Sequence, residues 1–281
     1  MIQRVSVIGA GTMGHGIAHA ALMAGYETAM FDVSDESLRK GRESVDQIVQ
    51  RSVELGKITA ESVLSLQKRF KTTTDLAEAL EDTDFVIEAA PEQIDLKLKL
   101  FGDIDRLAPN YAIVTSNTSA LSLTEMAGVL EQPERAAGMH FFNPVHKMRL
   151  VEIVQALKTA PETIEAVQEV ATRMGKETVV VRESPGFITT RINASLGNEA
   201  FYMLMEGVAS AQDIDKALKL GLNHPMGPFE LVDLVGLDTR LSILEYLHRS
   251  LGEKYRPCPL LVQYVKAGRL GRKVGKGVYE Y

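Results

Sequence analysis

The sequence of 281 residues predicts an α/β fold, in which an N-terminal doubly wound sheet with an inserted helical hairpin is followed by an all-α C-terminal domain. Three observations predict it. Apolar runs typical of strands recur between residues 5 and 181, with helical stretches between several of them. Residues 35–68 are too many for a simple connection and have helical periodicity broken around Gly56. Beyond residues 184–186 the chain contains no convincing strand.

The expected strands place several polar residues at their carboxyl ends. These strands cover residues 5–8, 28–31, 70–73, 85–88, 112–115, 136–140, 150–154 and 178–181. Ligands of doubly wound sheets bind outside the carboxyl ends of the strands. Gly9, Asp32, the segments 89–92 and 116–119, and His140 all lie at such ends, so we expect them to converge on one cleft.

A glycine-rich turn at residues 9–14 follows the first expected strand and opens an expected helix. Gly9 permits the tight bend, Gly11 lets the backbone approach a pyrophosphate, and Gly14 allows close packing of helix on strand. The helix N-terminus would face phosphate charge. Asp32 would bind the adenosine ribose hydroxyls and repel a 2′-phosphate, so this Rossmann-type arrangement predicts NAD rather than NADP. Further candidate cofactor contacts in these motifs are Thr12, Met13 and Asn117.

His140 and Glu152 are the candidate acid/base pair. A histidine titrates near neutrality, so it can take a proton from an alcohol while hydride leaves the same carbon; a carboxylate on its far ring nitrogen fixes the tautomer and stabilises the imidazolium. We expect Ser119 to donate a hydrogen bond to the substrate oxygen and Asn143 to hold the carboxamide of a nicotinamide ring. Together these residues predict a dehydrogenase active site.

The helix after the glycine-rich turn also carries two histidines. His15 and His19 lie one helical turn apart, a spacing that can hold zinc. We interpret them as surface or packing residues, because the predicted chemistry needs no metal.

Composition argues against nucleic-acid binding and against a membrane span. The formal net charge of −6 and the isoelectric point of ≈ 5.6 leave no basic footprint for nucleic acid. The single cysteine, Cys258, excludes an intrachain disulfide and fits a reducing compartment. Glycines interrupt the apolar stretch near the N-terminus, so we expect no signal peptide, no spanning helix and a cytoplasmic location.

The C-terminal part is expected to be entirely helical. Helices are expected over residues 187–208, 211–220, 228–247 and 260–267. We therefore assign residues 1–184 to an NAD-binding domain and residues 185–281 to an all-helical domain for substrate binding and dimerisation. Apolar stripes on these helices are more often core or subunit interface than ligand pocket, so a homodimer is expected.

Taken together, these motifs resemble the short-chain 3-hydroxyacyl-CoA dehydrogenase family, close to its bacterial 3-hydroxybutyryl-CoA members. The resemblance covers essentially the whole chain. Its matching segments are residues 9–14, 88–92 with Lys97, 116–119, 140–144, Glu152, 185–187, 224–228 and 270–281.

The resemblance implies reversible NAD-dependent oxidation of an (S)-3-hydroxyacyl-CoA to the 3-ketoacyl-CoA. It implies His140 as the catalytic base, Glu152 as its partner and Ser119 as a substrate and nicotinamide contact. The cofactor contacts that it implies are Asp32, Glu92, Lys97, Asn143 and Lys273. The inserted hairpin would cover the acyl-CoA. Its cations could meet phosphates, although a solvated helix face explains them equally well; they are Arg39, Lys40, Arg42, Arg51 and Lys57.

The chain departs from the family pattern at Thr190, where an asparagine usually helps to bind the substrate oxygen. Thr190 keeps a hydroxyl donor with a shorter reach, and Asn193 lies three positions further along the same expected helix, so we expect one of them to share this contact. Equally open is that Asn193 makes a local surface contact and Ser119 binds the oxygen alone. Two alternatives remain open at this stage. One is a related dehydrogenase of a free hydroxy acid, of the gulonate or carnitine type. The other is a non-catalytic NAD-binding structural relative.

Overall fold

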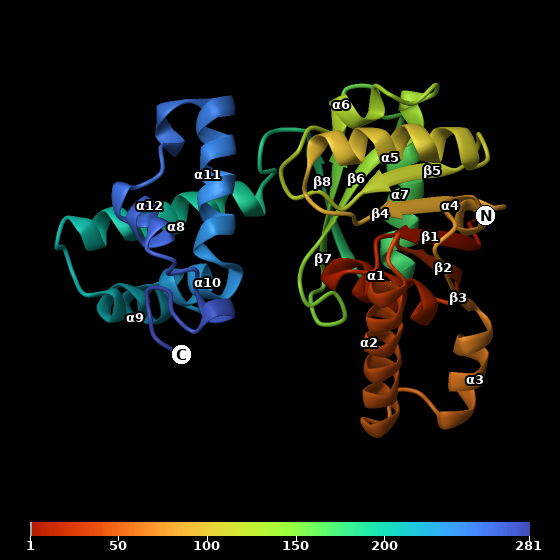
Figure 1. Cartoon of the computed structure of the whole chain (residues 1–281), viewed down its shortest axis with the longest axis horizontal. Coiled ribbons are helices and arrows are strands. Elements are labelled where there is room, and N and C mark those ends of the chain that lie inside the picture. Colours follow the sequence, from red (N-terminus) through yellow and green to blue (C-terminus); the bar gives the residue numbers. More distant parts are fainter. Residues whose placement is uncertain (1) are drawn as a thin grey trace. The chain divides into compact units, whose positions relative to one another are not determined.

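The strands of the first 183 residues form one eight-stranded sheet in the order β3-β2-β1-β4-β5-β6-β7-β8 (Figure 1). All neighbouring strands are parallel except β6 and β7, which are antiparallel. The sheet extends in both directions from β1, which confirms the predicted doubly wound arrangement. The strands are β1 Arg4–Ile8, β2 Glu27–Phe31, β3 Phe70–Thr73, β4 Phe85–Glu88, β5 Ile113–Ser116, β6 Ala136–Phe141, β7 Leu150–Gln155 and β8 Glu177–Arg182.

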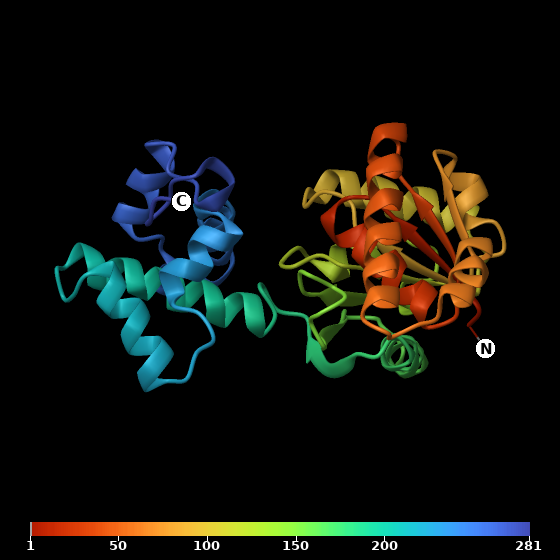
Figure 2. The same ribbon diagram turned by 90° about the horizontal axis from the view of Figure 1, so that it is seen from below.

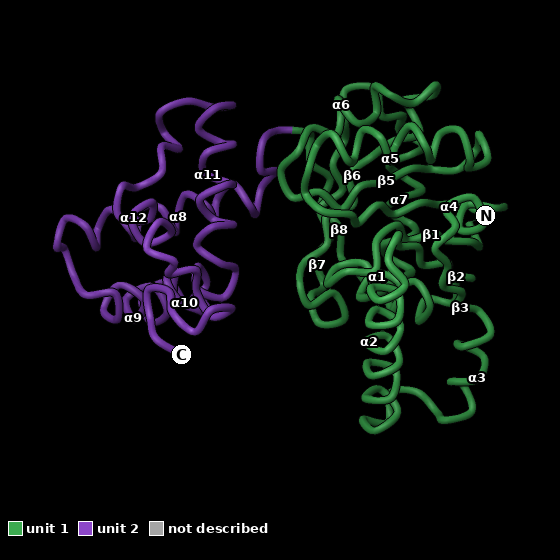
Figure 3. Tube along the Cα trace, viewed as in Figure 1, with its two compact units in different colours: residues 1–183 green, residues 184–281 purple. Residues whose placement is uncertain are grey.

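This computed structural model describes residues 2–281, and the chain divides into two compact units, Met1–Glu183 and Ser184–Tyr281 (Figure 3). The first unit contains the whole sheet. Its helices are α1 Thr12–Met23, α2 Asp35–Glu54, α3 Ala60–Lys68, α4 Leu76–Leu80, α5 Ile94–Leu107, α6 Leu123–Ala127 and α7 Pro161–Arg173. A 3-10 turn, η1 Pro133–Arg135, precedes β6.

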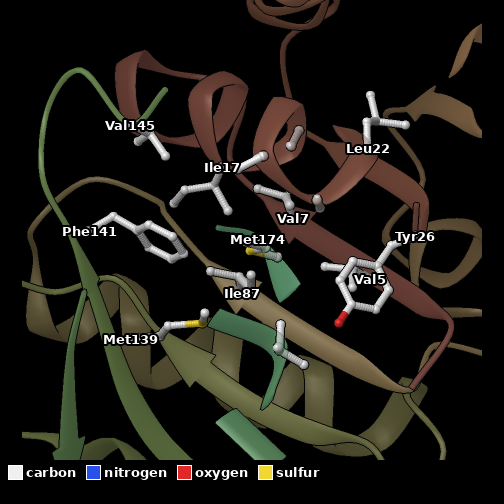
Figure 4. Packing of buried hydrophobic residues seen from close by; sticks show 14 of the residues in the cluster. Val5, Val7, Ile17, Leu22, Tyr26, Ile87, Met139, Phe141, Val145 and Met174 are labelled. Atoms are coloured by element: carbon white, nitrogen blue, oxygen red, sulfur yellow. The ribbon is translucent and has the colours of Figure 1, made fainter. Parts of the chain in front are cut away.

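One face of the sheet is covered by α1, α2 and α7. Ile17 and Leu22 of α1 and Met174 at the end of α7 pack against Val7 and Ile87 of the strands, all in one buried cluster (Figure 4). Burying such side chains is worth about 1.5–3 kcal/mol each relative to leaving them exposed. This cluster is therefore the main apolar core of the first unit.

The opposite face carries α4, α5 and α6. There the Ser6 hydroxyl, one position from Val7, donates to the Ala79 carbonyl of α4 at 2.5 Å. Successive side chains of a strand point to opposite faces. Because Ile87 and Met139 belong to the first core, their neighbours Glu88 and His140 point to the second face. The chemistry-bearing residues thus lie on the side of the sheet away from the main core.

The predicted helical hairpin is present as α2 and α3, which extend away from the sheet (Figure 1). Ser34 caps α2 by accepting from the Ser37 N–H, and Thr59 caps α3 by accepting from the Ser62 N–H. Gly56, between the two helices, has a φ of +66°, a conformation that glycine adopts without steric cost. The break therefore falls where the periodicity of the sequence is interrupted.

The second unit is built from helices, as predicted. Its helices are α8 Thr189–Met205, α9 Ala211–Gly221, α10 Pro228–Val235, α11 Leu237–Leu251 and α12 Pro259–Lys266, with the short turns η2 Glu253–Tyr255 and η3 Arg272–Val274. Helices α10, α11 and α12 all contact α8 (Figure 2). The buried core between them includes Phe201, Phe229 and Leu244. Within residues 2–281, no helix is both long enough and apolar enough to cross a membrane.

One predicted helix of the second unit is wrong in its extent. Residues 228–247 were expected to form a single helix, but the chain breaks at Gly236 into α10 and α11. Gly236 has a φ of +105°, so it leaves the helical conformation between two segments that share one apolar periodicity. Its N–H still bonds the Val232 carbonyl at 2.8 Å and so closes α10.

Two glycines of the glycine-rich turn give a matched test of its packing. A Cβ on residue 14 would lie 1.8 Å from the Gly9 carbonyl oxygen, whereas a Cβ on residue 11 would meet nothing within 4 Å. Gly14→Ala should therefore lower the free energy of unfolding by about 3 kcal/mol or more, and Gly11→Ala should change it by less than about 0.5 kcal/mol. Urea unfolding measures both. Equal midpoints for the two variants would contradict this account of the turn.

Candidate functional site

His140 and Glu152 face each other across the antiparallel pair of strands. They are direct partners in the register of β6 and β7, so their side chains leave the sheet on the same face. His140 Nδ1 lies 2.7 Å from Glu152 Oε2. Glu152 has no exposed surface and His140 is 5% exposed. The strand register therefore holds a carboxylate on one ring nitrogen of a buried histidine.

A second buried pair lies at the carboxyl ends of β4 and β5. Lys97 Nζ of α5 is 2.6 Å and 2.8 Å from the two carboxylate oxygens of Glu88, and the Ser116 hydroxyl donates to Glu88 Oε2 at 2.5 Å. All three side chains are almost completely buried, with exposed fractions of 0–1%. These groups form hydrogen bonds with one another, which replace the hydrogen bonds to water that burial removes.

Glu92 organises the turn that carries Ser119. Its Oε1 accepts hydrogen bonds from the Thr118 hydroxyl at 2.6 Å, the Ser119 N–H at 2.9 Å and the Ala120 N–H at 3.3 Å. Its Oε2 lies 3.6 Å from Lys97 Nζ. The half-exposed carboxylate of Glu92 thus connects the Ser119 turn to the buried pair.

Asn117, which follows β5, reaches across to β6. Its Oδ1 accepts a hydrogen bond from the Phe141 N–H at 2.9 Å, immediately after His140. The main chain beside the histidine is therefore tied to the same segment that carries Ser119.

The glycine-rich turn and Asp32 lie at the carboxyl ends of β1 and β2, which stand beside β4 and β5 in the sheet. Gly9 has a φ of +114° and donates its N–H to the Phe31 carbonyl at 2.7 Å. Asp32 accepts hydrogen bonds from the Ala10 N–H at 2.9 Å and from the Ser34 N–H at 3.0 Å. Thr12 and Met13 open α1 directly after the turn. Asp32 thus ties the glycine-rich turn to the segment that follows β2.

The remaining predicted site residues occupy other positions. Asn143 is exposed in the loop after β6. Thr190 and Asn193 are partly buried on α8 of the second unit. Lys273, also in the second unit, pairs with Asp238 at 2.6 Å.

Sequence reasoning assigned no role to Glu88, Ser116 or Thr118. A signal was present, because Glu88 ends a strand whose other residues are all apolar and buried, and a carboxylate there requires a partner. The identity of that partner was not readable, since Lys97 and Ser116 come from other elements.

His19 is the second histidine of the α1 pair and behaves as a packing residue. It is 7% exposed, and neither ring nitrogen has a hydrogen-bond partner among residues 2–281. Burial, together with the nearby His146 and Lys176, lowers its pKa to about 4. Its neighbour His15 instead has Nδ1 2.9 Å from the Gly11 carbonyl oxygen. In the described part of the chain no cluster of three or more His, Cys, Asp or Glu side chains is arranged to hold a metal ion.

Known proteins resemble this chain over its whole length. Residues 4–184 match the NAD binding domain of 3-hydroxyacyl-CoA dehydrogenase, and residues 186–281 match the C-terminal domain of that enzyme. A probable 3-hydroxybutyryl-CoA dehydrogenase of Bacillus subtilis (strain 168) is 47% identical over 281 residues, which span 100% of this chain and 98% of the relative. A 3-hydroxyadipyl-CoA dehydrogenase of Escherichia coli (strain K12) is 40% identical, over 100% of this chain and 59% of the relative.

Among solved structures, the (S)-3-hydroxybutyryl-CoA dehydrogenase of Ralstonia eutropha is similar with a TM-score of 0.97 and 44% sequence identity. The match covers 100% of this chain and 99% of that structure. Both units of the chain are therefore shared with solved relatives.

The burial of His19 predicts a pH dependence of stability. Its pKa is about 4 in the folded chain and about 6.5 in an unfolded one, so between these values the unfolded state binds more protons. The contribution of neutral, buried His19 to the free energy of unfolding is complete above about pH 6.5 and is lost as the pH falls toward 4. Between about pH 7 and pH 5 the free energy of unfolding of the wild type should therefore fall by about 2 kcal/mol more than that of His19→Leu. Urea titrations at both pH values check this, and equal losses would contradict it.

Proposed function

The chain belongs to the 3-hydroxyacyl-CoA dehydrogenase family, and we propose on that premise that it reversibly oxidises a short-chain (S)-3-hydroxyacyl-CoA, such as (S)-3-hydroxybutyryl-CoA, to the 3-ketoacyl-CoA with NAD. These matches confirm the family that the motifs predicted. They also confirm the prediction that the protein is an NAD-dependent oxidoreductase. The buried pair of His140 and Glu152 carries the mechanism. It supplies a base and its charge partner at the edge of the sheet where dinucleotides bind.

The glycine-rich turn fits a dinucleotide. There is space beside Gly11, where a Cβ would meet nothing within 4 Å, while Gly14 packs too closely on Gly9 to carry a side chain. We assign the pyrophosphate to residues 9–14, with Thr12 and Met13 at the helix N-terminus, and the adenosine ribose to Asp32. When bound, NAD supplies the hydride acceptor.

His140 acts as the base that takes the proton of the substrate hydroxyl. In the neutral ring, a proton on Nδ1 is donated to Glu152, so Nε2 carries the lone pair. Nε2 takes the proton of the substrate hydroxyl, and the imidazolium that results is stabilised by the Glu152 carboxylate. Ser119 donates a hydrogen bond to the substrate oxygen as it changes from hydroxyl to carbonyl.

Other assignments extend this proposal. Thr190 or Asn193 shares the substrate oxygen contact, and Asn117, Asn143 and Lys273 are assigned to the cofactor.

We also propose a homodimer that works in the cytoplasm. The apolar side chains exposed on the second unit support the dimer, and the single, unpaired cysteine supports the location. A native mass measurement tests the dimer.

The two alternatives are less well supported. The relatives reported above are named for CoA thioesters rather than free acids. An intact His140–Glu152 pair is expected of a catalyst and serves no purpose in a passive structural protein.

The deciding experiment follows reduced nicotinamide absorbance with purified protein. We expect acetoacetyl-CoA to be reduced efficiently, longer 3-ketoacyl-CoAs and 3-ketoadipyl-CoA more slowly, and free keto acids not at all. Comparable rates with free acids would support the first alternative, and no turnover with any substrate would support the second.

Removing the base or its partner should slow the chemistry and leave cofactor binding in place. His140→Ala should lower kcat by about 10²-fold or more, the usual contribution of a positioned general base. Glu152→Gln should also lower kcat, because the imidazolium loses its countercharge. Steady-state kinetics and NADH titration separate the two effects. Weaker NADH binding with unchanged kcat would assign the pair a structural role.

Asp32 should set the choice of cofactor. Asp32→Ser removes the charge that repels a 2′-phosphate, so the ratio of kcat/KM for NAD to that for NADP should fall by about tenfold or more, equivalent to about 1.4 kcal/mol. Kinetics with both cofactors measure the ratio. Equal use of NAD and NADP by the unmodified protein would refute this role.

A further inference from the structure

We propose that Lys176, the residue before β8, is a positioning residue for hydride transfer. It fixes residues 142–149, the β6–β7 loop, and through this loop it orients Asn143 toward the nicotinamide ring. The inference deepens the proposed function, because it rests on the assignment of Asn143 to the cofactor.

The ammonium group of Lys176 binds the main chain of the β6–β7 loop at two points. Its Nζ donates to the Val145 carbonyl at 2.5 Å and to the Met148 carbonyl at 2.8 Å. The residue is 9% exposed, and burial lowers the pKa of Lys176 with no carboxylate to offset the effect. A buried ammonium group requires hydrogen-bond acceptors. The two loop carbonyls supply them, so the position of the loop and that of the ammonium group depend on each other.

The remaining main-chain hydrogen bonds of the loop are internal. The N–H groups of Lys147 and Met148 both donate to the Pro144 carbonyl at 3.0 Å. The loop therefore contains a turn of its own. Among residues 2–281, Lys176 is the residue that ties residues 143–148 to another segment by hydrogen bonds to their main chain.

The loop also packs against α1, the helix that follows the glycine-rich turn. Val145 belongs to the buried cluster beside this helix (Figure 4). A Cβ on residue 16 would lie 3.0 Å from Cβ and Cγ2 of Val145, so Gly16 allows the close approach. The rings of His19 and His146 meet edge to face, with centroids 6.4 Å apart. The loop is thereby held between the helix that we assign to the pyrophosphate and the ammonium group of Lys176.

Loss of this anchor should affect Asn143 more than the acid/base pair. The strand register of β6 and β7 fixes His140 and Glu152 independently of the loop. Asn143 lies in the loop itself, outside the strands. The expected defect is therefore at the nicotinamide end of the cofactor, whereas binding of the adenosine end at the glycine-rich turn should be unchanged. Such a defect matters for the rate, because a misplacement of about 1 Å can cost about 10²-fold.

The test measures the two ends of the cofactor separately. ADP-ribose carries the adenosine, the pyrophosphate and the second ribose of NAD but no nicotinamide, so titrations with ADP-ribose and NADH distinguish the two ends. The kcat with acetoacetyl-CoA is expressed per ADP-ribose site, which counts the folded molecules. The variants are Lys176→Met, Asn143→Ala, the two combined, and Lys147→Met as a control at an exposed lysine of the same loop.

For Lys176→Met we expect an ADP-ribose Kd within about twofold of the wild type, an NADH Kd higher by about three- to tenfold, and a kcat lower by about tenfold or more. The primary isotope effect with deuterated NADH should rise, because a misaligned ring slows hydride transfer more than the other steps. Lys147→Met should match the wild type in every measurement. If Lys176→Met does not fold, Lys176→Gln, which keeps an amide donor for the loop carbonyls, carries the same expectation with a smaller loss.

The double variant tests whether Lys176 acts through Asn143. Two residues that serve the same contact do not have additive effects. In the Asn143→Ala background, Lys176→Met should therefore lower kcat by less than about twofold further.

Three results would overturn the inference. An unchanged kcat and NADH Kd in Lys176→Met would mean that the loop needs no anchor. An equal rise in the Kd of ADP-ribose and NADH would mean a general effect on the cofactor-binding unit. Additive losses in the double variant would mean that Lys176 does not act through Asn143.

Failure of the proposed function is visible separately, as wild-type protein that does not reduce acetoacetyl-CoA. In that case the Kd values of ADP-ribose and NADH decide alone, and an equal change in both overturns the inference. If Asn143→Ala retains the NADH Kd and kcat of the wild type, the assignment of Asn143 is wrong and the inference is overturned with it.

Discussion

The buried charge of Glu88 is the constraint on which the rest of the site depends. An isolated carboxylate in a protein interior is costly, so all of its lone pairs must be met by donors. Those donors come from Lys97, Ser116 and the Ala90 N–H, which lie on three different segments. Satisfying one charge therefore draws together the ends of two strands and the start of a helix. The segments that carry the chemistry are built onto this assembly.

The single antiparallel pairing in the sheet has a separate consequence. Parallel neighbours need a crossover connection of about a dozen residues or more, so residues close in sequence are not placed opposite each other. Because β7 reverses direction after β6, His140 and Glu152 become direct partners although they are twelve positions apart in the chain. The reversal also brings both side chains to the same face of the sheet, where the carboxylate is shielded from water.

Much of the fold could be predicted because its signals are local. Apolar strands, the glycines of the first turn and the interrupted periodicity near Gly56 each reflect a backbone preference that acts within a few residues. The break at Gly236 was not predicted, because an isolated glycine within a continuous helical pattern is often tolerated and only its φ of +105° reveals the interruption. Local pattern therefore identified the elements better than their limits.

The candidate site divides in the same way. By itself, the sequence determined which residue types could carry the chemistry, such as His140, because acid/base capacity belongs to the side chain. Only the tertiary structure decided what surrounds those residues: Lys97 is buried against Glu88, and Glu92 accepts a hydrogen bond from the Ser119 N–H. The reason is physical, since the partner of a buried charge is set by packing between elements distant in sequence, which no local pattern encodes.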